Sequence, residues 1–393
     1  MKILCLGCGA MGKVAIRDLA QHSDFSEIIV ADCDVEKAEQ YVRSLGDKRL
    51  KHEFIDVTDR ARLVELMRGV DLVLSTVGPF YRYGLAVVEA ALEAGRSLVD
   101  ICDDYDVTPK VLELDEQAKE RGITIITGLG ASPGATNLLA KLGAQRLDEA
   151  EEVHIGLVQS AADPEGGPAV VYHVFHSMYG QVPTYIDGKY IDVTAFVDGE
   201  EEAVFPEPIG AFNLYHIGHP EPLTLPRYIP GLKYVDCKLN LNPPLLKDMI
   251  VELGNMGLIS SEAIEVKGVE LSPLDFFVAY LSRIAEEPLL TGIPYEGAVR
   301  VEVRGKKDGG PARVIYTAQA RMNEGTGVPL SIGAQLLAAG EIEERGGGVF
   351  PPEGCIDPSS FIQEMVKRGF AGQEIFETTH ITEFSELAKG KGG

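Results

Sequence analysis

The sequence predicts an α/β protein that begins with a doubly wound parallel sheet and continues into a second α+β domain with a mainly antiparallel sheet. Three observations support this prediction. Apolar runs alternate with segments of helical periodicity up to about residue 130, the first turn carries glycines in a nucleotide-binding spacing, and residues 298–320 alternate as in a hairpin. At roughly 100–200 residues per domain, a chain of 393 residues is long enough for two domains.

The first part of the chain alternates strand and helix patterns. Its strand candidates are short and almost wholly apolar, as expected where helices cover both faces of a parallel sheet. The expected strands are 2–6, 27–32, 52–57, 71–77, 97–101 and 123–128. The expected helices between them are 12–22, 35–45, 60–69, 85–95 and 111–122.

The pattern changes after about residue 130. Ser132 and Pro133 are typical of an N-cap and a first helical residue. Residues 298–305 alternate valine with charged residues, and the turn 306–310 leads to a second run at 312–320, which predicts a hairpin with one solvated face. A further strand is expected at 152–158, and further helices over 132–147, 272–287, 329–342 and 359–370.

Charge and hydropathy narrow the function classes. The net charge of −24 argues against nucleic-acid binding, which needs a basic patch. The acidic field either attracts a cationic substrate or serves solubility alone. No apolar run approaches the ~18 residues of a membrane span, and no basic segment leads into an apolar one as in a signal peptide. We therefore expect a cytoplasmic protein without a membrane partner.

The cysteines predict no metal centre. Cys5 and Cys8 form a C-x-x-C, a spacing found in zinc and redox sites. Here the first cysteine lies in the expected first strand, the second lies in the following turn, and no second pair follows. We expect no metal, with the cysteines acting as small apolar side chains in a reducing compartment.

The glycine spacing G-x-G-x-x-G at Gly7, Gly9 and Gly12 predicts a Rossmann-type nucleotide site. The first glycine permits the tight turn, the second lets the backbone approach a pyrophosphate, and the third lets helix and strand pack closely. Ala10 and Met11 would open the helix whose N-terminal N–H groups face the phosphates.

The second strand ends on an acid that bears on the choice of nucleotide. Asp32 lies twenty residues after Gly12 and can accept hydrogen bonds from the adenine ribose hydroxyls. A 2′-phosphate would meet this carboxylate, and Cys33 and Asp34 supply no arginine to offset it. The sequence therefore predicts NAD, with NADP less favoured.

Candidate ligand-binding residues follow the fourth and fifth strands, at the edge where doubly wound sheets bind ligands. Thr76, Gly78 and Pro79 could line the nicotinamide ribose. The adjacent acids Asp103 and Asp104 could bind a substrate ammonium or orient a water, although such a pair is also common at a helix start.

The motifs together resemble the saccharopine dehydrogenase family in its glutamate-forming sense, a group that includes lysine 6-dehydrogenase and carboxynorspermidine dehydrogenase. The resemblance rests on segments that follow in the same order over nearly the whole chain: GCGAMG, STVGPFYRYGLAVVEAALEAG, LVDICDD, GLGASPGATNLLA, GHPEPLTLPR and TGVPLSIGAQLLAAGEI. It implies a two-domain homodimer with a nucleotide domain at 1–130, a substrate and dimerisation domain at 131–324, and a segment 325–393 that returns to the nucleotide domain.

The resemblance also implies the chemistry. Hydride passes between an amine-bearing carbon of a small molecule and the nicotinamide, and the imine is hydrolysed. The leading expectation is NAD-dependent oxidation of lysine at its 6-amine, because length and Asp32 agree with that type. Saccharopine reductase or carboxynorspermidine dehydrogenase activity is the alternative, and a nucleotide-binding sensor without turnover is the opposing class.

Amine oxidation needs a base, and an amino-acid substrate needs a cation for its carboxylate and acceptors for its ammonium. Asp104, His173 and His176 are the catalytic candidates, and one histidine of the four at 173, 176, 216 and 219 is expected to act as the base or to face the imine. Arg227 is the candidate carboxylate clamp because a guanidinium matches a carboxylate bidentately. The remaining candidates for substrate contact are Tyr81, Asp103, Ser132, His216 and Thr326, the last in a loop expected to reach back to the nicotinamide ahead of a helix from Pro329.

Overall fold

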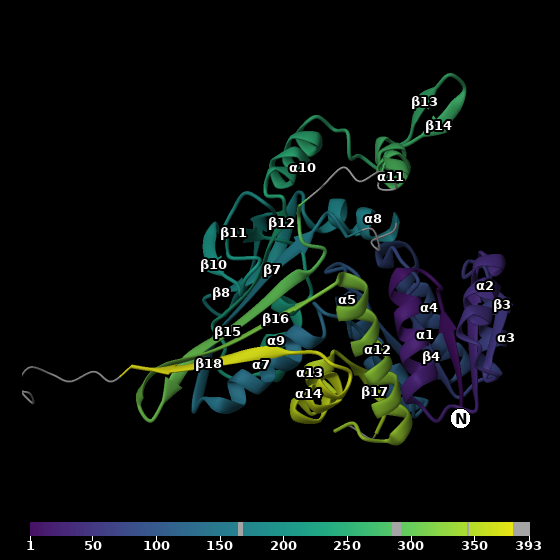
Figure 1. Ribbon diagram of the computed structural model, residues 1–393, viewed down its shortest axis with the longest axis horizontal. Helices are drawn as coiled ribbons and strands as arrows, with labels where there is room; N and C mark the ends of the chain where they lie inside the picture. The colour runs from purple at the N-terminus through teal and green to yellow at the C-terminus, as the bar shows by residue number, and fades with distance from the viewer. Residues whose placement is uncertain (164–167, 285–291, 344–345, 380–393) are drawn as a thin grey trace, which may run out of the picture.

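The computed structural model describes residues 1–163, 168–284, 292–343 and 346–379. Figure 1 shows two sheets side by side, the N-terminal one with its helices at the right and a longer, inclined one at the left. A small projection at the top carries α10 (Leu245–Asn255), α11 (Pro273–Ile284) and the hairpin of β13 (Ile264–Val266) and β14 (Val269–Leu271).

The N-terminal sheet is parallel throughout and has the strand order β17-β6-β5-β4-β1-β2-β3. The strands are β1 (Lys2–Leu6), β2 (Glu27–Asp32), β3 (Leu50–Phe54), β4 (Leu72–Ser75), β5 (Ser97–Asp100), β6 (Thr124–Ile126) and β17 (Gly348–Phe350). The helices are α1 (Ala10–His22), α2 (Val35–Leu45), α3 (Arg60–Arg68), α4 (Phe80–Ala94), α5 (Thr108–Leu112), α6 (Asp115–Glu120) and α12 (Met322–Ala339).

Helices cover both faces of this sheet, as the apolar strands predict. In β1, Ile3 and Cys5 pack into a core shared with α1 and α12, whereas Leu4 and Leu6 pack into a core shared with α3 and α4. Successive side chains of a strand point to opposite faces, so a strand buried on both sides must be apolar at every position. The predicted doubly wound sheet is confirmed.

The second sheet is mixed, with the order β10-β11-β12-β7-β15-β16-β18 and with β8 pairing to β12 and β9. Its strands are β7 (Glu149–Ser160), β8 (Gln181–Ile186), β9 (Lys189–Thr194), β10 (Glu201–Val204), β11 (Ala211–His216), β12 (Tyr234–Asn242), β15 (Gly297–Lys307), β16 (Gly310–Ala320) and β18 (Gly372–Thr378). Only β7 and β12 run parallel among its described pairs. The helices of this part are α7 (Ala135–Arg146), α8 (Pro168–Ser177), α9 (Glu221–Tyr228), α13 (Pro352–Cys355) and α14 (Pro358–Lys367). The predicted mainly antiparallel sheet is confirmed.

The hairpin of β15 and β16 forms as expected, but its charged face is not solvated throughout. Asp308 and Gly309 form its two-residue turn, with φ of 51° and 79°, the conformation that suits an Asp-Gly turn. Glu302, expected on the solvated face, is buried because Arg300 and Arg304 pair with it and cover it. Burial opposes its charge, but these guanidinium groups outweigh that effect and lower the pKa of Glu302 to about 2.

The last part of the chain divides between the two sheets. The helix α12 lies against α1, where Ser331 Oγ donates to Asp18 Oδ2 at 2.6 Å and Arg368 Nε reaches the same carboxylate at 2.8 Å. The last two strands join different sheets. The strand β17 extends the parallel sheet, and β18 pairs with β16 in the second sheet (Figure 1).

Several expected helix bounds are wrong. The helix expected over 85–95 begins at Phe80, and the one expected over 111–122 is divided into α5 and α6. The helix expected from Pro329 begins at Met322, so Thr326 and Gly327 are helical and the proline lies inside the helix. The first turns of α12 pack so closely on α1 that a Cβ on Gly327 would lie only 2.6 Å from Met11 O. This packing outweighs the tendency of proline to mark the start of a helix. The helix expected from Ser132 begins instead at Ala135, where Asn137 Oδ1 accepts from Gly134 N at 2.9 Å.

Candidate active site

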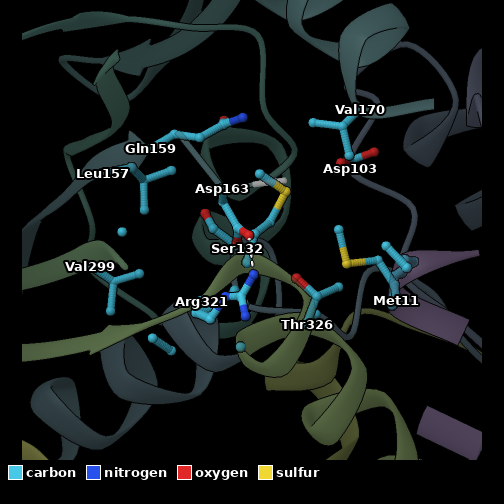
Figure 2. A pocket seen from close by; sticks show the side chains of 18 of the residues that line it. Met11, Asp103, Ser132, Leu157, Gln159, Asp163, Val170, Val299, Arg321 and Thr326 are labelled. Atoms are coloured by element: carbon cyan, nitrogen blue, oxygen red, sulfur yellow. Dashed lines mark hydrogen bonds and ion pairs between the residues drawn. The ribbon is translucent and has the colours of Figure 1, made fainter. Parts of the chain in front are cut away.

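One cavity of about 290 Å³ lies between the two sheets and is lined by residues of both (Figure 2). From the nucleotide side come the glycine loop and the residues that follow β4 and β5. From the other side come the end of β7, one side of α8, and the facing parts of β15 and β16. The start of α12 closes the cavity near the glycine loop.

The glycine loop fits a dinucleotide. Gly7 has a φ of 94°, which an L side chain rarely adopts, and a Cβ on Gly12 would lie 2.1 Å from Gly7 O. Gly9 faces open space, with nothing within 4 Å of an added Cβ. Gly9 is the N-cap residue of α1 and has no side chain, so no capping side chain covers the first N–H groups of the helix, those of Ala10 and Met11. A pyrophosphate would be held there by these N–H groups and the helix dipole.

The Asp32 carboxylate is fixed at the end of β2. Its Oδ2 accepts from Cys8 N at 2.6 Å and its Oδ1 accepts from Asp34 N at 2.8 Å. The acid is thereby tied to the glycine loop, with lone pairs left for ribose hydroxyls. Cys8 itself is buried, and the burial of its thiol raises its pKa to about 11.

Residues after β4 form the adjoining wall of the cavity. Thr76, Gly78 and Pro79 all line it, as expected from their place at the carboxyl edge. The Thr76 hydroxyl lies 3.2 Å from Leu6 O and from Gly7 O, so it secures the glycine loop to β4.

A cluster of two acids and a histidine lies where the chain leaves β5. His173, on α8, approaches Asp104 Oδ1 at 2.9 Å and Asp103 Oδ1 at 3.3 Å, both through Nδ1. Asp104 is buried, with 1% of its side chain exposed, and its Oδ2 accepts from Tyr81 N at 2.7 Å. Of the three, Asp103 and His173 line the cavity (Asp103 is labelled in Figure 2).

The cluster perturbs the titration of its members. Burial alone would lower the pKa of His173, but the charge of Asp103 and the hydrogen bond to Asp104 outweigh it and raise that pKa to about 9. Burial likewise opposes ionisation of Asp104, yet the His173 contact dominates and lowers the pKa of this acid. Asp103 behaves oppositely, since burial raises its pKa and the charge of Asp104 adds to that. At neutral pH the histidine is therefore an imidazolium held by carboxylates.

A second histidine lies beside the first. His219 packs edge-on against His173, with ring centroids 5.4 Å apart, and its Nδ1 lies 3.1 Å from Glu221 Oε2. The buried Glu221 also accepts a hydrogen bond from the Ser132 hydroxyl, and both Ser132 and His219 line the cavity. Burial opposes the charge of Glu221, but His219 and Ser132 outweigh it and lower its pKa.

Four other candidates for catalysis or substrate contact do not line the cavity. His176 is stacked between Tyr81 and Tyr105 and approaches Asp106 Oδ1 at 3.1 Å, so its ring faces away from the cluster. His216 is buried next to Gly199, on the strand β11. The side chain of Arg227 is exposed on α9, and Tyr81 contributes its backbone N–H rather than a cavity surface. Thr326 does line the cavity, near Met11 (Figure 2).

Sequence reasoning missed one charged pair in the cavity wall. Arg321 Nη2 contacts Asp163 Oδ1 at 2.6 Å, and both residues line the cavity. The available signal was position, because Arg321 follows the strand β16 directly and precedes the segment expected to reach the nicotinamide. Several other arginines also lie in charged strands, so the residue type alone did not single out Arg321.

Two models of one protein family together match most of the chain. Residues 3–126 match the family model for the saccharopine dehydrogenase NADP binding domain, and residues 130–370 match the model for the saccharopine dehydrogenase C-terminal domain. The protein belongs to the saccharopine dehydrogenase family. Its apo relative from Saccharomyces cerevisiae, saccharopine dehydrogenase (L-Glu forming), has the same fold, with a TM-score of 0.68 at 18% identity over 96% of this chain and 99% of that one.

Two curated relatives align over almost the whole chain. Carboxyaminopropylagmatine dehydrogenase of Synechocystis sp. is 23% identical over 95% of this chain and 97% of its own length. Carboxynorspermidine synthase of Vibrio alginolyticus is 24% identical over 94% of this chain and 95% of its own.

The expected family and the expectation of an enzyme are confirmed: the chain is an oxidoreductase with a pyridine-nucleotide domain. The family description names NADP, whereas Asp32 predicts NAD. No helix in the described parts of the chain is long and apolar enough to cross a bilayer.

Proposed function

We propose that this protein is an NAD(P)-dependent dehydrogenase of a carboxylated polyamine, a secondary amine with an α-amino-acid end and a cationic amine end. The observation that carries the proposal is the single cavity shared by the glycine loop and the Asp103–Asp104–His173 cluster. The substrate class draws on the two relatives that align over almost the whole chain, whose names specify a carboxyaminopropyl derivative of agmatine and a carboxylated norspermidine. The leading expectation from the sequence, lysine 6-dehydrogenation, has no such support.

The chain's part in the reaction is proton transfer and orientation. The bound nicotinamide supplies hydride in the reductive direction and accepts it in the oxidative one. Because Nδ1 of His173 is held by Asp103 and Asp104, Nε2 is the ring nitrogen that exchanges a proton with the substrate nitrogen. As an imidazolium it donates to the imine nitrogen, which makes the neighbouring carbon electrophilic. In the oxidative direction the neutral ring accepts the ammonium proton before hydride can leave.

The acids and the second histidine position this group. Asp104 fixes the His173 tautomer from a buried site, much as a carboxylate orients a histidine in other acid–base catalysts. The partly exposed Asp103 attracts the cationic amine. The Ser132–Glu221–His219 chain holds a polar wall on which the water that hydrolyses the imine can be oriented.

We propose NAD as the preferred nucleotide. The fixed Asp32 carboxylate can accept hydrogen bonds from a ribose 2′-hydroxyl and would repel a 2′-phosphate. This proposal departs from the name of the family model, and kinetics with both nucleotides decide between them.

The test is absorbance at the reduced-nicotinamide band with purified protein. NAD and NADP are each combined with carboxynorspermidine, carboxyaminopropylagmatine, saccharopine or L-lysine. We expect reduction of NAD with a carboxylated polyamine. Turnover with lysine or saccharopine alone would replace the substrate class and keep the enzyme. Nucleotide binding without turnover across the panel would contradict the proposal and favour a sensor.

A further inference from the structure

The cavity contains a second histidine that proton transfer at the substrate nitrogen does not use. His219 lines the cavity beside His173, with ring centroids 5.4 Å apart and ring planes at 70°. Its Nδ1 lies 3.1 Å from Glu221 Oε2, and its Nε2 has no hydrogen-bond partner among the described residues. Two histidines, each held through Nδ1 by a carboxylate, therefore line one cavity.

Backbone contacts fix the position of His219 relative to His173. The segment between β11 and α9 carries His219, and Gly218 N in this segment donates to Ser177 O at 2.7 Å. Ser177 ends α8, the helix that carries His173, and its hydroxyl donates to His173 O at 2.9 Å. A Cβ on Gly218 would lie 2.5 Å from the Tyr105 ring, so the segment packs closely here. The spacing of the two histidine rings is therefore set by contacts within the fold.

Glu221 is placed to stabilise a positive charge on His219. It is buried as the first residue of α9, where the helix dipole favours a carboxylate. Its Oε1 accepts from the Ser132 hydroxyl and, at 3.3 Å, from the Thr136 hydroxyl, while Oε2 faces His219 Nδ1 (Ser132 is labelled in Figure 2). A ring that donates Nδ1–H to this carboxylate carries its lone pair at Nε2, and the carboxylate stabilises the imidazolium that forms when Nε2 takes a proton.

Hydrolysis of an imine needs two groups of opposite protonation state. As water attacks, a C–O bond forms, the π-electron pair of the C=N bond moves to nitrogen, and the nitrogen takes up a proton. The water loses a proton in the same step. His173 serves the nitrogen, so the water needs a different base. Because the imine carbon and nitrogen are bonded to each other, the two groups must be neighbours, as His173 and His219 are.

We propose that His219 is the general base for the water that attacks the imine carbon, with Glu221 as its positioning residue. This inference rests on the proposed function, in which a secondary amine is oxidised to an imine. Nε2 of His219 takes a proton from the water while His173 gives its proton to the nitrogen, which yields a carbinolamine. The proton returns from His219 to His173 through solvent. The same pair then acts again as the C–N bond breaks, the hydroxyl proton leaves and the C=O bond forms. In the reductive direction, the His219 imidazolium protonates the departing hydroxyl group.

The test separates hydride transfer from hydrolysis in the oxidative direction. The full-length protein is mixed rapidly with NAD and a carboxylated polyamine, and reduced nicotinamide is followed by absorbance. In His219→Gln we expect an unslowed burst of about one reduced nicotinamide per active site and then a steady-state rate lowered roughly 10²-fold, the order expected for a lost general base. Cyanoborodeuteride added during the slow phase should return deuterium-labelled secondary amine, because the imine accumulates. His173→Gln should lose the burst itself, and His176→Gln, whose ring faces Asp106, should behave like the unaltered protein.

A second variant tests the positioning role of Glu221. Glu221→Gln is nearly isosteric and keeps an acceptor for Nδ1 but removes the charge, so it should keep the burst and slow the steady state less than His219→Gln does. NAD affinity and the melting temperature of each variant report whether the fold survives. An unchanged steady-state rate in a folded His219→Gln, or loss of its burst, would overturn the role of His219 alone. An unaltered protein that transfers no hydride from a carboxylated polyamine would overturn the proposed function and this inference with it.

Discussion

The proton-transfer role that we propose for His173 makes a specific prediction about pH. Raising its pKa from 6.5 to about 9 corresponds to about 3 kcal/mol in favour of the imidazolium. The reductive rate should therefore be flat through neutral pH and fall above about pH 9, while the oxidative rate should rise toward that pH. Replacing His173 by Gln should lower kcat by roughly 10²–10⁴-fold and remove this dependence.

The assay is the initial rate in each direction from pH 6 to 10, with His176→Gln as matched control. His176 lies one turn away on the same helix but faces Asp106, so its replacement should change kcat less than threefold. Asp104→Asn should move the apparent pKa of the profile down toward the ordinary histidine value, because the carboxylate charge that favours the imidazolium is lost. An unchanged profile in His173→Gln, or equal losses in His173→Gln and His176→Gln, would refute the reasoning.

Other residues give predictions of their own. Asp32→Ser should weaken NAD and improve NADP, measured as a fall in the ratio of their kcat/KM values, and an unchanged ratio would contradict the assignment of Asp32 to the ribose. Gly12→Ala should lower the melting temperature, since its Cβ would lie 2.1 Å from a backbone oxygen, whereas Gly9→Ala should keep that temperature and weaken NAD binding in titrations. Glu302→Gln should lower the free energy of unfolding in urea at pH 7 by about 3 kcal/mol, because two guanidinium groups lose their buried partner. In the unaltered protein this contribution is present above the ordinary glutamate pKa and is lost as pH falls toward about 2, and equal urea stability of the two proteins at pH 7 would count against it.

The nucleotide half of the site was predictable because its determinants are local. The turn at Gly7, the close approach at Gly12 and the acid that ends the second strand all occur within one strand–helix–strand unit. Parallel strands end at a common edge, so the residues after β4 and β5 had to meet there whatever the rest of the chain did. The location of Asp103 and Asp104 at this edge could therefore be predicted from their place in the sequence.

The orientation of the two histidines on α8 could not be predicted in this way. His173 and His176 are three residues apart on one helix, and periodicity cannot say which of them faces the parallel sheet. That depends on how α8 packs against Asp104 and against the aromatic rings of Tyr81 and Tyr105. These contacts join residues that are about 70 to 95 positions apart in the chain. The helix beginning at Met322 was missed for a similar reason, because its packing on α1 overrides a proline signal.

Arg227 and Arg321 show why the arginine that lines the cavity could not be predicted from the sequence. Both follow apolar segments, and chemistry alone favours either as a carboxylate clamp. The parallel sheet constrains neither, since both belong to the second domain, where strand order runs β12-β7-β15-β16 and ignores sequence order. That order places the end of β16 near the end of β7, so Arg321 meets Asp163 across 158 residues of chain, while the Arg227 side chain is left exposed on α9. The cavity wall opposite the glycine loop is assembled by this non-local strand pairing, so the loop could be predicted from the sequence while the wall could not.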